Sequence, residues 1–304
     1  MKVLFTAIRD WANHGYIMSK CLQSVGIEST MITQNPPKIN YGEGGIIVKN
    51  PIKWNEYVAD CDVLIIMHSQ YVGTDVDLTN KKVLVFHTGT KYRSHYNSLN
   101  TKFNAFVDAT LVAADIFELG NVKNEFYVPV AVDTNKFVPN YTLSGPLFVG
   151  HYPTQPTTKG GPYIKKILPT IPGINFEVDA SRMTWEKHLL RLKKCDIYIE
   201  DVGTHDGKGN PQKGGMGLTA LEAAAMGNIV ISRMNYIDKY ERELGKCGIQ
   251  VIQDPEELPF LLNKIVRSSK EELIKLKKAS REWVERVHSY KAVGMLFKTI
   301  IKGL

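Results

Sequence analysis

Short runs of Val, Ile, Leu and Phe recur along the whole chain, and stretches with helical periodicity separate them. A strand covered on both faces of a parallel sheet has a continuous apolar run of this kind. The pattern therefore predicts an α/β protein built from parallel sheets with helices on both faces. The expected strands are Val3–Ile8, Thr30–Thr33, Val63–Met67, Val83–Phe86, Thr110–Ala113, Phe126–Val128, Leu147–Gly150, Ile174–Val178, Ile197–Glu200, Ile229–Ser232 and Gln250–Ile252.

These strands form two series of similar length, each interleaved with helices. A chain of 304 residues is long for one core and suits two. We therefore predict two Rossmann-like, doubly wound domains with a cleft between them. A Pro-bounded segment, 129–139, and the polar stretch after it place the boundary between a first domain, 1–141, and a second domain, 142–288. Ser269 to Glu272 has the pattern of a capping box that opens an amphipathic helix.

Composition narrows the class further. No apolar run approaches the length of about 20 residues that spans a bilayer. The four cysteines are scattered singly, so neither disulfides nor a cysteine metal site is expected. This pattern favours a reducing compartment and a cytoplasmic location. The net charge of +7 and the pI near 9.0 predict an anionic partner, whether a nucleotide, a phospholipid surface or a nucleic acid.

The most informative segment runs from Lys213 to Gly227 and leads through several glycines into a helix rich in Ala and Leu. The first amide groups of a helix have no partner within it, and the helix dipole makes this end positive. The segment therefore predicts a phosphate site. Glu222 lies in the apolar part of this helix, where a carboxylate needs a partner such as a ribose hydroxyl pair. The alternative is a flexible loop before an ordinary helix.

A second turn with a basic residue and glycines, Lys159–Gly161, follows the first strand of the second series. Ligands of a doubly wound sheet bind beyond the carboxyl ends of its strands, so this turn and the glycine turn before Leu218 are expected to share one crevice. Lys159 could then neutralise the phosphates that the helix binds. The alternative is a solvated lysine.

In the first series, His68 and His87 each stand at the carboxyl end of an expected strand, where they face the predicted crevice. Their equivalent positions favour a functional role over two isolated hydrogen-bonding histidines. Gly15 follows the first strand and allows a ligand to approach the backbone. Asp75 and Asp77 resemble a metal-binding Asp-x-Asp pair, but no phosphate loop accompanies them, so no metal site is expected.

Together these segments resemble the retaining glycosyltransferases of family 4 (glycosyl transferases group 1), which have the GT-B fold, and the resemblance covers most of the chain. Residues 215–223, Gly-Met-Gly-Leu-Thr-Ala-Leu-Glu-Ala, are similar to the family's Gly-Phe-Gly-x-x-x-Leu-Glu-Ala. Lys159-Gly160 is similar to its Lys-Gly, and the segment from Val130 to Pro139 is similar to its interdomain segment. Residues 62–68 and the turn at 86–88 resemble loops of its first domain.

The resemblance implies a hexosyl- or related glycosyltransferase that moves a sugar from a UDP- or GDP-linked donor to an acceptor hydroxyl, with retention and without a metal or cofactor. It implies catalytic roles for His68 on the transferred sugar, Lys159 on the diphosphate and Glu222 on the ribose. The first domain is then the acceptor side, the second binds the donor, and the helix in 289–304 packs back on the first. The implied acceptor-side residues are His87 and Thr88, and the implied donor-binding residues are Gly15, Gly150, His151, Lys159, Met183, Gly215, Met216, Gly217, Leu218, Thr219 and Glu222.

Two positions depart from the family pattern. The family usually has a glutamate eight positions before the ribose glutamate, and this chain has Gly214 there. The family's frequent Gly-Arg is Gly150-His151 here, which removes a cation from the expected diphosphate site. These departures leave the identity of the donor open.

Two other functions stay open at this stage. The basic charge also suits a glycosyltransferase that modifies DNA carrying hydroxylated bases, and its binding would weaken steeply with salt. A non-catalytic nucleotide-sugar binding protein would bind the donor without cleaving it. The sequence leaves the acceptor open among a polysaccharide, a lipid, a small molecule and DNA, and it is also compatible with peripheral contact with a membrane.

Overall fold

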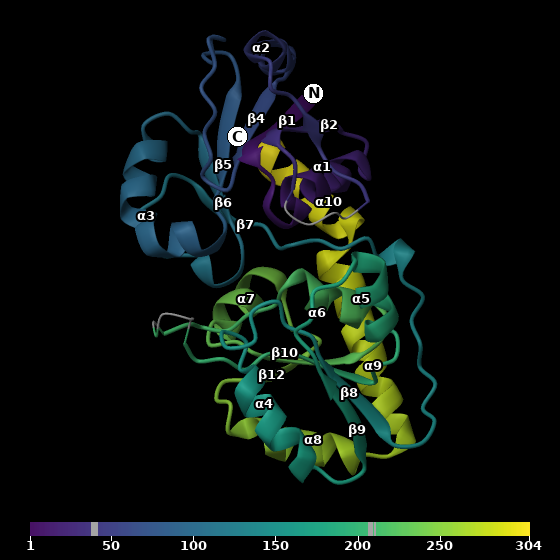
Figure 1. Ribbon diagram of the computed structural model, residues 1–304. Helices are drawn as coiled ribbons and strands as arrows, with labels where there is room; N and C mark the ends of the chain where they lie inside the picture. The colour runs from purple at the N-terminus through teal and green to yellow at the C-terminus, as the bar shows by residue number, and fades with distance from the viewer. Residues whose placement is uncertain (38–41, 206–208, 210) are drawn as a thin grey trace. The chain divides into compact units, whose positions relative to one another are not determined.

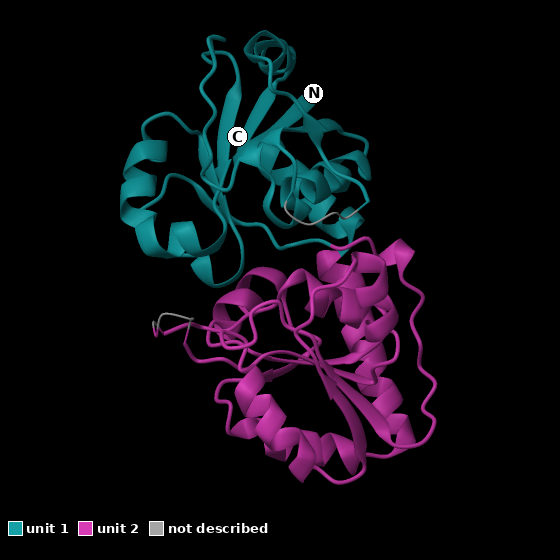
Figure 2. Ribbon diagram, in the orientation of Figure 1, with its two compact units in different colours: residues 1–131, 289–304 teal, residues 132–288 magenta. Residues whose placement is uncertain are grey.

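The computed structural model describes residues 1–37, 42–205, 209 and 211–304, and the chain divides into two compact units (Figure 1, Figure 2). Unit 1 consists of Met1–Ala131 and Ser289–Leu304, and unit 2 is Val132–His288. The chain thus passes between the units after residue 131, earlier than the expected position 141, and returns to unit 1 with its last helix.

Unit 1 has, within its described residues, a seven-stranded sheet in the order β3-β2-β1-β4-β5-β6-β7, and all of the pairings are parallel. The strands are β1 (Lys2–Arg9), β2 (Glu28–Asn35), β3 (Ile46–Ile47), β4 (Val63–Met67), β5 (Lys82–Phe86), β6 (Ala109–Val112) and β7 (Glu125–Tyr127). The helices are α1 (His14–Gln23), α2 (Pro51–Asp60), α3 (Gly89–Asn104) and α10 (Tyr290–Gly303), with short 3-10 turns η1 (Trp11–Asn13) and η2 (Ala114–Ile116).

Successive side chains of β1 serve opposite faces of this sheet, as strand geometry requires. Leu4 packs in one cluster with Trp54 of α2 and Phe103 of α3. Phe5 points the other way and meets Phe297 of α10, with ring centroids 5.8 Å apart. Helix α10 also packs against α1. The C-terminal helix is therefore part of the core of unit 1.

Unit 2 has a five-stranded sheet, again within the described residues, in the order β12-β11-β10-β8-β9 and with parallel pairings throughout. The strands are β8 (Leu147–His151), β9 (Ile174–Val178), β10 (Ile197–Asp201), β11 (Ile229–Arg233) and β12 (Gln250–Ile252). The helices are α4 (Gly161–Ile167), α5 (Trp185–Leu192), α6 (Leu218–Ala225), α7 (Ile237–Leu244), α8 (Glu257–Val266) and α9 (Lys270–Trp283), with 3-10 turns η3 (Thr134–Lys136) and η4 (Leu168–Thr170) and a π-helical turn η5 (Val284–His288).

The strand order changes direction at one place in each sheet. In unit 1 the chain moves outward from β1 to β2 and β3, then crosses to β4 on the other side of β1. In unit 2 it moves from β8 to β9 and then crosses to β10 on the other side of β8. Loops diverge at such a switch point and leave room for a ligand beyond the strand ends. The expected sites therefore lie at the carboxyl ends of β1 and β4, and of β8 and β10.

All eleven expected strands are present, within one or two residues at each end. The predicted capping box is also confirmed, because the Ser269 side chain accepts from the Glu272 amide and the Glu272 side chain accepts from the Ser269 amide. Strand β3 was not predicted. It has two residues, both exposed at the edge of the sheet, and such a segment carries no periodic pattern.

Candidate functional site

Two backbone turns are held together where β8 and β10 end, and they aim Lys159 at β10. The Val202 amide donates to the Lys159 carbonyl oxygen at 3.3 Å. Gly160 has φ +76°, and a Cβ there would lie 2.5 Å from a methyl group of Val202. A Cβ on Gly203 would overlap the Thr158 carbonyl oxygen. Glycine is thus required on both turns for this close approach.

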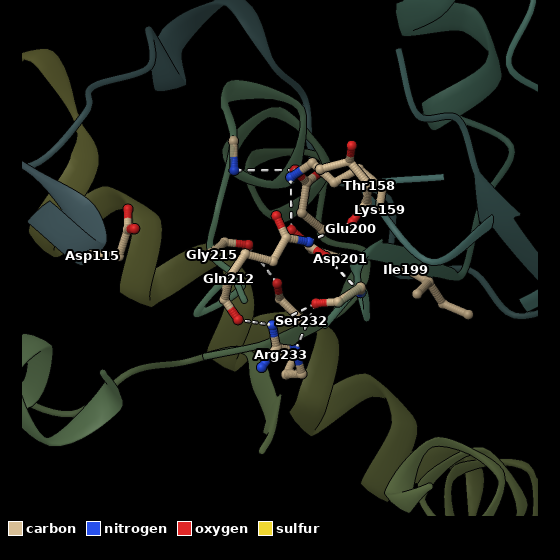
Figure 3. Close-up of polar contacts among 12 residues, drawn as sticks. Asp115, Thr158, Lys159, Ile199, Glu200, Asp201, Gln212, Gly215, Ser232 and Arg233 are labelled. Carbon is tan, nitrogen blue, oxygen red and sulfur yellow. Dashed lines mark hydrogen bonds and ion pairs between the residues drawn. The ribbon is translucent and has the colours of Figure 1, made fainter. Parts of the chain in front are cut away.

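The Lys159 ammonium group lies between two carboxylates (Figure 3). Its Nζ atom is 2.9 Å from Oε1 of Glu200 and 3.2 Å from Oδ2 of Asp201. The same Glu200 Oε1 atom accepts the Gly217 amide at 3.2 Å. Both carboxylates are buried, whereas the lysine side chain is partly exposed. A lysine and a helix N-terminus therefore converge on one anionic oxygen of the chain itself.

Burial and pairing oppose each other in this cluster. Burial lowers the pKa of Lys159, but the attraction of Glu200 and Asp201 outweighs it and the pKa is raised. For Glu200, burial raises the pKa and the neighbouring ammonium outweighs it, so the pKa is lowered. For Asp201, burial is the larger effect and the pKa is raised. At neutral pH the lysine is thus charged and paired with an ionised Glu200.

The turn before α6 brings together the glycines that the sequence analysis selected. Gly217 is the N-cap of α6, and the Gly215 carbonyl oxygen accepts from the Ser232 hydroxyl group at 2.6 Å (Figure 3). Gly214 has φ +71°, and a Cβ there would overlap the Arg233 carbonyl oxygen. No glutamate fits at position 214 without a change of the backbone. Met216, Leu218 and Thr219 lie at the same helix terminus.

Glu222 is buried in the same helix, and its partner is an aromatic residue that the sequence analysis missed. The indole Nε1 of Trp185, the first residue of α5, donates to Glu222 Oε1 at 2.7 Å. Burial raises the pKa of Glu222, the hydrogen bond from Trp185 opposes this rise, and the charge of Glu200 adds to it. The resulting pKa is about 7. The carboxyl group is thus held in one orientation, and its pKa lies near neutral pH.

His151 cannot replace the missing arginine as a cation. It is fully buried at the end of β8, and its Nδ1 atom lies 2.8 Å from the Ile199 carbonyl oxygen. A carbonyl oxygen only accepts, so Nδ1 carries the proton and Nε2 presents a lone pair. Nε2 has no hydrogen-bond partner among the described residues. Burial lowers the pKa of His151 to about 4, so the ring is neutral and offers an acceptor.

Gly150 and Met183 of unit 2 are held by local contacts. A Cβ on Gly150 would overlap the Cys195 thiol, so the glycine is required for strand packing. Met183 precedes α5, and its sulfur accepts a 3.6 Å hydrogen bond from Arg191. These contacts fix the local packing of β8 and of the segment before α5.

In unit 1, Asp10 organises the ends of β1 and β4. Its Oδ1 accepts the Gly15 amide at 2.8 Å and its Oδ2 accepts the Tyr16 amide at 2.9 Å. His68 places Nε2 2.9 Å from Asp10 Oδ1 and Nδ1 2.5 Å from the Thr88 hydroxyl oxygen. The structure therefore brings the predicted residues His68 and Thr88 together, and it engages the Gly15 amide with a carboxylate.

The backbone at this corner is in a conformation that side chains rarely adopt. The φ angles are +55° at Ala12, +57° at Asn13, +57° at His68 and +56° at Ser69. Each such residue costs on the order of 1 kcal/mol and persists only where its surroundings hold it, and such residues cluster at functional sites. The conformation of His68 is therefore imposed by its surroundings.

His87 has a different environment from His68. It is fully buried, its Nδ1 lies 2.7 Å from the Ser69 hydroxyl oxygen, and its ring stacks on Tyr92 with centroids 4.1 Å apart. Burial lowers the pKa of His87 to about 3, so the ring is neutral. The structure thus places His87 beneath the surface, where it supports the residues next to it.

Asp75 and Asp77 have local partners. Asp77 Oδ1 accepts from the Thr79 amide at 3.0 Å and from its hydroxyl group at 2.6 Å. Asp75 accepts from Asn55 at 3.2 Å. In the described part of the chain, no group of three or more His, Cys, Asp or Glu side chains is arranged to hold a metal ion.

Four residues of these sites were missed: Asp10, Trp185, Glu200 and Asp201. The last two had a signal, because a strand that is otherwise apolar ends in two adjacent carboxylates. Asp10 also follows a strand directly. Nothing in the sequence pairs Trp185 with a glutamate 37 residues away.

Comparisons with known proteins bear on the fold. No family model matches the sequence, and no curated protein does. Solved structures that match the chain over its whole length show that it has the GT-B fold. Sucrose-phosphate synthase from Thermosynechococcus elongatus matches with a TM-score of 0.67 at 10% identity, covering 100% of this chain and 98% of that chain. HepE from Anabaena in complex with UDP-glucose has a TM-score of 0.64 at 10% identity and 100% coverage of both chains.

A third solved structure agrees. The trehalose-6-phosphate synthase OtsA matches with a TM-score of 0.63 at 9% identity, covering 100% of this chain and 99% of that chain. At such identities the likeness establishes the fold, and the chemistry must be argued from the residues. None of the helices in the described residues is both long and apolar enough to cross a membrane.

Proposed function

We propose that the chain is a glycosyltransferase that transfers a sugar from a nucleoside-diphosphate sugar to an acceptor hydroxyl group. One observation carries the proposal: the Lys159 ammonium group and the Gly217 amide converge on a single anionic oxygen. Donors arranged to bind a carboxylate oxygen are also suited to a phosphate oxygen. The solved complex of HepE with UDP-glucose, which has the same fold, supports a UDP-linked donor, and a GDP-linked donor is the alternative.

In the proposed reaction, the bond between the anomeric carbon and the diphosphate oxygen breaks, and the acceptor oxygen bonds to the same face of that carbon. Because attack and departure occur on the same face, configuration is retained, and the departing phosphate oxygen takes the acceptor proton. Lys159 and the amides at the start of α6 stabilise the charge that develops on the diphosphate, which is the role that a metal has in other transferases. We propose that Glu222 binds the ribose and that His68 binds a hydroxyl group of the transferred hexose. Thr88 then lies on the acceptor side.

The four cysteines are buried and form no disulfide with one another, which supports a reducing compartment. We therefore propose that the reaction takes place in the cytoplasm. The acceptor is proposed only by its chemistry, as a hydroxyl group.

The test is to incubate the protein with a panel of UDP- and GDP-sugars in the presence of EDTA and to measure turnover as the release of the nucleoside diphosphate. We expect Lys159→Ala to lower the rate by about 100-fold, because one charged contact to the leaving group is lost. Lys166→Ala is the matched control, since it removes an exposed lysine of α4 in the same unit, and we expect it to leave the rate unchanged.

Two results would contradict the proposal. If none of these donors binds or is cleaved, and Lys159→Ala changes nothing, the site does not bind a donor. If a donor binds but its sugar–phosphate bond stays intact through long incubation with acceptor mixtures, the chain is a binding protein rather than an enzyme.

A further inference from the structure

We infer that Glu200 is an internal stand-in for the donor diphosphate, which binds by displacing the Glu200 carboxylate from Lys159 and from the Gly217 amide. This inference rests on the proposed function and adds a residue that sets the affinity and charge selectivity of the same site. In the free protein the Glu200 carboxylate fills the anion position, and in the complex a phosphate oxygen fills it.

The contacts of Glu200 are those of a bound anion. A single oxygen, Oε1, receives both the Lys159 ammonium group at 2.9 Å and the Gly217 amide at 3.2 Å. Gly217 permits this approach, because a Cβ at that position would lie 2.8 Å from the same oxygen. The amide belongs to the N-terminus of α6, where the helix dipole favours negative charge. The site thus already binds an anionic oxygen.

The strand geometry explains why Glu200 can leave. The register between β10 and β11 shifts between Ile199 and Asp201, so Glu200 is the extra residue of a bulge and pairs with no residue of β11. The extra residue of a bulge is left out of the strand pairing, and bulges can re-aim a side chain. Glu200 can therefore turn away from α6 without breaking a pairing to β11.

Asp201 is the partner that stays. Its Oδ2 faces Lys159 at 3.2 Å, and its Oδ1 also accepts the Gly203 amide at 2.8 Å (Figure 3). This second bond anchors the carboxylate to the turn that follows β10. Arg233 reinforces that turn, because its guanidinium group donates to the Gly203 and Gln212 carbonyl oxygens. Lys159 thus keeps one carboxylate when Glu200 leaves, and it stays at the end of β10.

The charges around Lys159 determine which anions can displace Glu200. In the free protein Lys159 faces two carboxylates, and the neighbouring His151 ring is neutral. A lone phosphate ion must compete with Glu200 using a few contacts only. A nucleoside diphosphate also binds through its ribose and base, and this additional binding free energy can drive the exchange. The stand-in therefore selects nucleotides over simple anions.

The experiment measures the affinity for UDP and GDP by titration calorimetry at pH 8 and constant ionic strength. We expect Glu200→Gln and Glu200→Ala to bind the preferred nucleotide about tenfold more tightly than the unchanged protein, because a charged competitor is gone. Asp201→Asn also removes one negative charge near Lys159, but it leaves the Gly217 amide occupied, so its gain should be smaller. Glu271→Gln, on the exposed first turn of α9, is the control for net charge and should change nothing.

Inorganic phosphate provides a second probe. We expect it to bind Glu200→Ala measurably and the unchanged protein at least tenfold more weakly. Glu200→Gln is nearly isosteric, so it keeps the test valid if the alanine variant unfolds.

The outcomes separate the two ideas. Weaker nucleotide binding in both Glu200 variants would show that Glu200 orients Lys159 for the ligand, and unchanged binding would show that Glu200 does not compete with it. Either result overturns the inference and leaves the proposed function standing. If neither the unchanged protein nor any variant binds UDP or GDP, or cleaves their sugars, the proposed function itself fails.

Discussion

Replacing Glu222 by glutamine should make the protein more stable and a poorer nucleotide binder. Glu222 is only 3% exposed, and burial raises its pKa to about 7. A carboxyl group whose pKa is higher in the folded than in the unfolded state stabilises the fold only while it is protonated. Its ionisation at higher pH therefore costs stability. Glutamine resembles the protonated acid in shape and can still accept the indole hydrogen bond of Trp185.

The magnitude follows from the two pKa values. The pKa of Glu222 rises from the ordinary 4.5 to about 7 in the folded protein, which corresponds to about 3 kcal/mol of unfolding free energy. The penalty is absent below pH 4.5, grows as pH rises, and is complete above pH 7. The advantage of Glu222→Gln over the unchanged protein should therefore rise from near zero at pH 4.5 to about 3 kcal/mol at pH 8.

Urea unfolding at pH 5, 6, 7 and 8 measures this difference, with the exposed Glu271→Gln as the control. Nucleotide affinity measured on the same samples should fall for Glu222→Gln, because ribose hydroxyl groups donate more strongly to a carboxylate than to an amide oxygen. A stability difference that stays constant across this pH range would refute the reasoning, since it would mean that Glu222 ionises as freely in the folded chain as in the unfolded chain.

Three further substitutions, and one glycine control, test the packing around the sites by thermal and urea unfolding. Lys159→Met should destabilise unit 2 by about 3 kcal/mol at pH 7, because two buried carboxylates lose their cation, and most of this loss should disappear in acid. Asp10→Asn should cost about 1 kcal/mol, since the start of α1 loses a charged acceptor for two amides; an unchanged melting curve would contradict this. Gly214→Ala should cost about 3 kcal/mol or more, because its φ is +71° and a Cβ overlaps a carbonyl oxygen. Gly145→Ala, with φ +75° and open space, should cost only about 1 kcal/mol, and equal losses would show that overlap is not the cause.

The architecture could be predicted because it depends on patterns that are local in the sequence. The run at 63–67 is apolar at every position, and the structure covers β4 on both faces. The glycine turn and the Ala-rich segment after it are adjacent in the chain, so the start of α6 could be placed before any contact was known. The edge strand β3 has only Ile46 and Ile47, both exposed, and depends on its neighbour β2 for its existence. No local pattern could have indicated it.

The chemistry of the sites was less accessible, because it depends on contacts between distant residues. Lys159 was predicted to bind an anion, but the anion that it meets is 41 residues away, on a strand whose register shifts at that point. A shift of one residue decides whether Glu200 faces α6 or the opposite side of the sheet. His151 lies in the expected place, yet its neutrality follows from complete burial and a carbonyl partner.

Both units place a carboxylate of the chain at a helix N-terminus beyond the switch point, but the two carboxylates differ in how they are held. Asp10 uses both of its oxygens on amides five and six residues away, and Oδ1 also contacts His68. A phosphate beneath Gly15 would have to break all three contacts. Glu200 Oε1 contacts one amide and a lysine that retains Asp201, and the Tyr198 hydroxyl group also hydrogen-bonds to the Glu200 carboxylate. The exchange of an internal carboxylate for a ligand anion is therefore expected at α6 and not at α1, so Asp10→Asn should leave nucleotide affinity without the gain expected of Glu200→Gln.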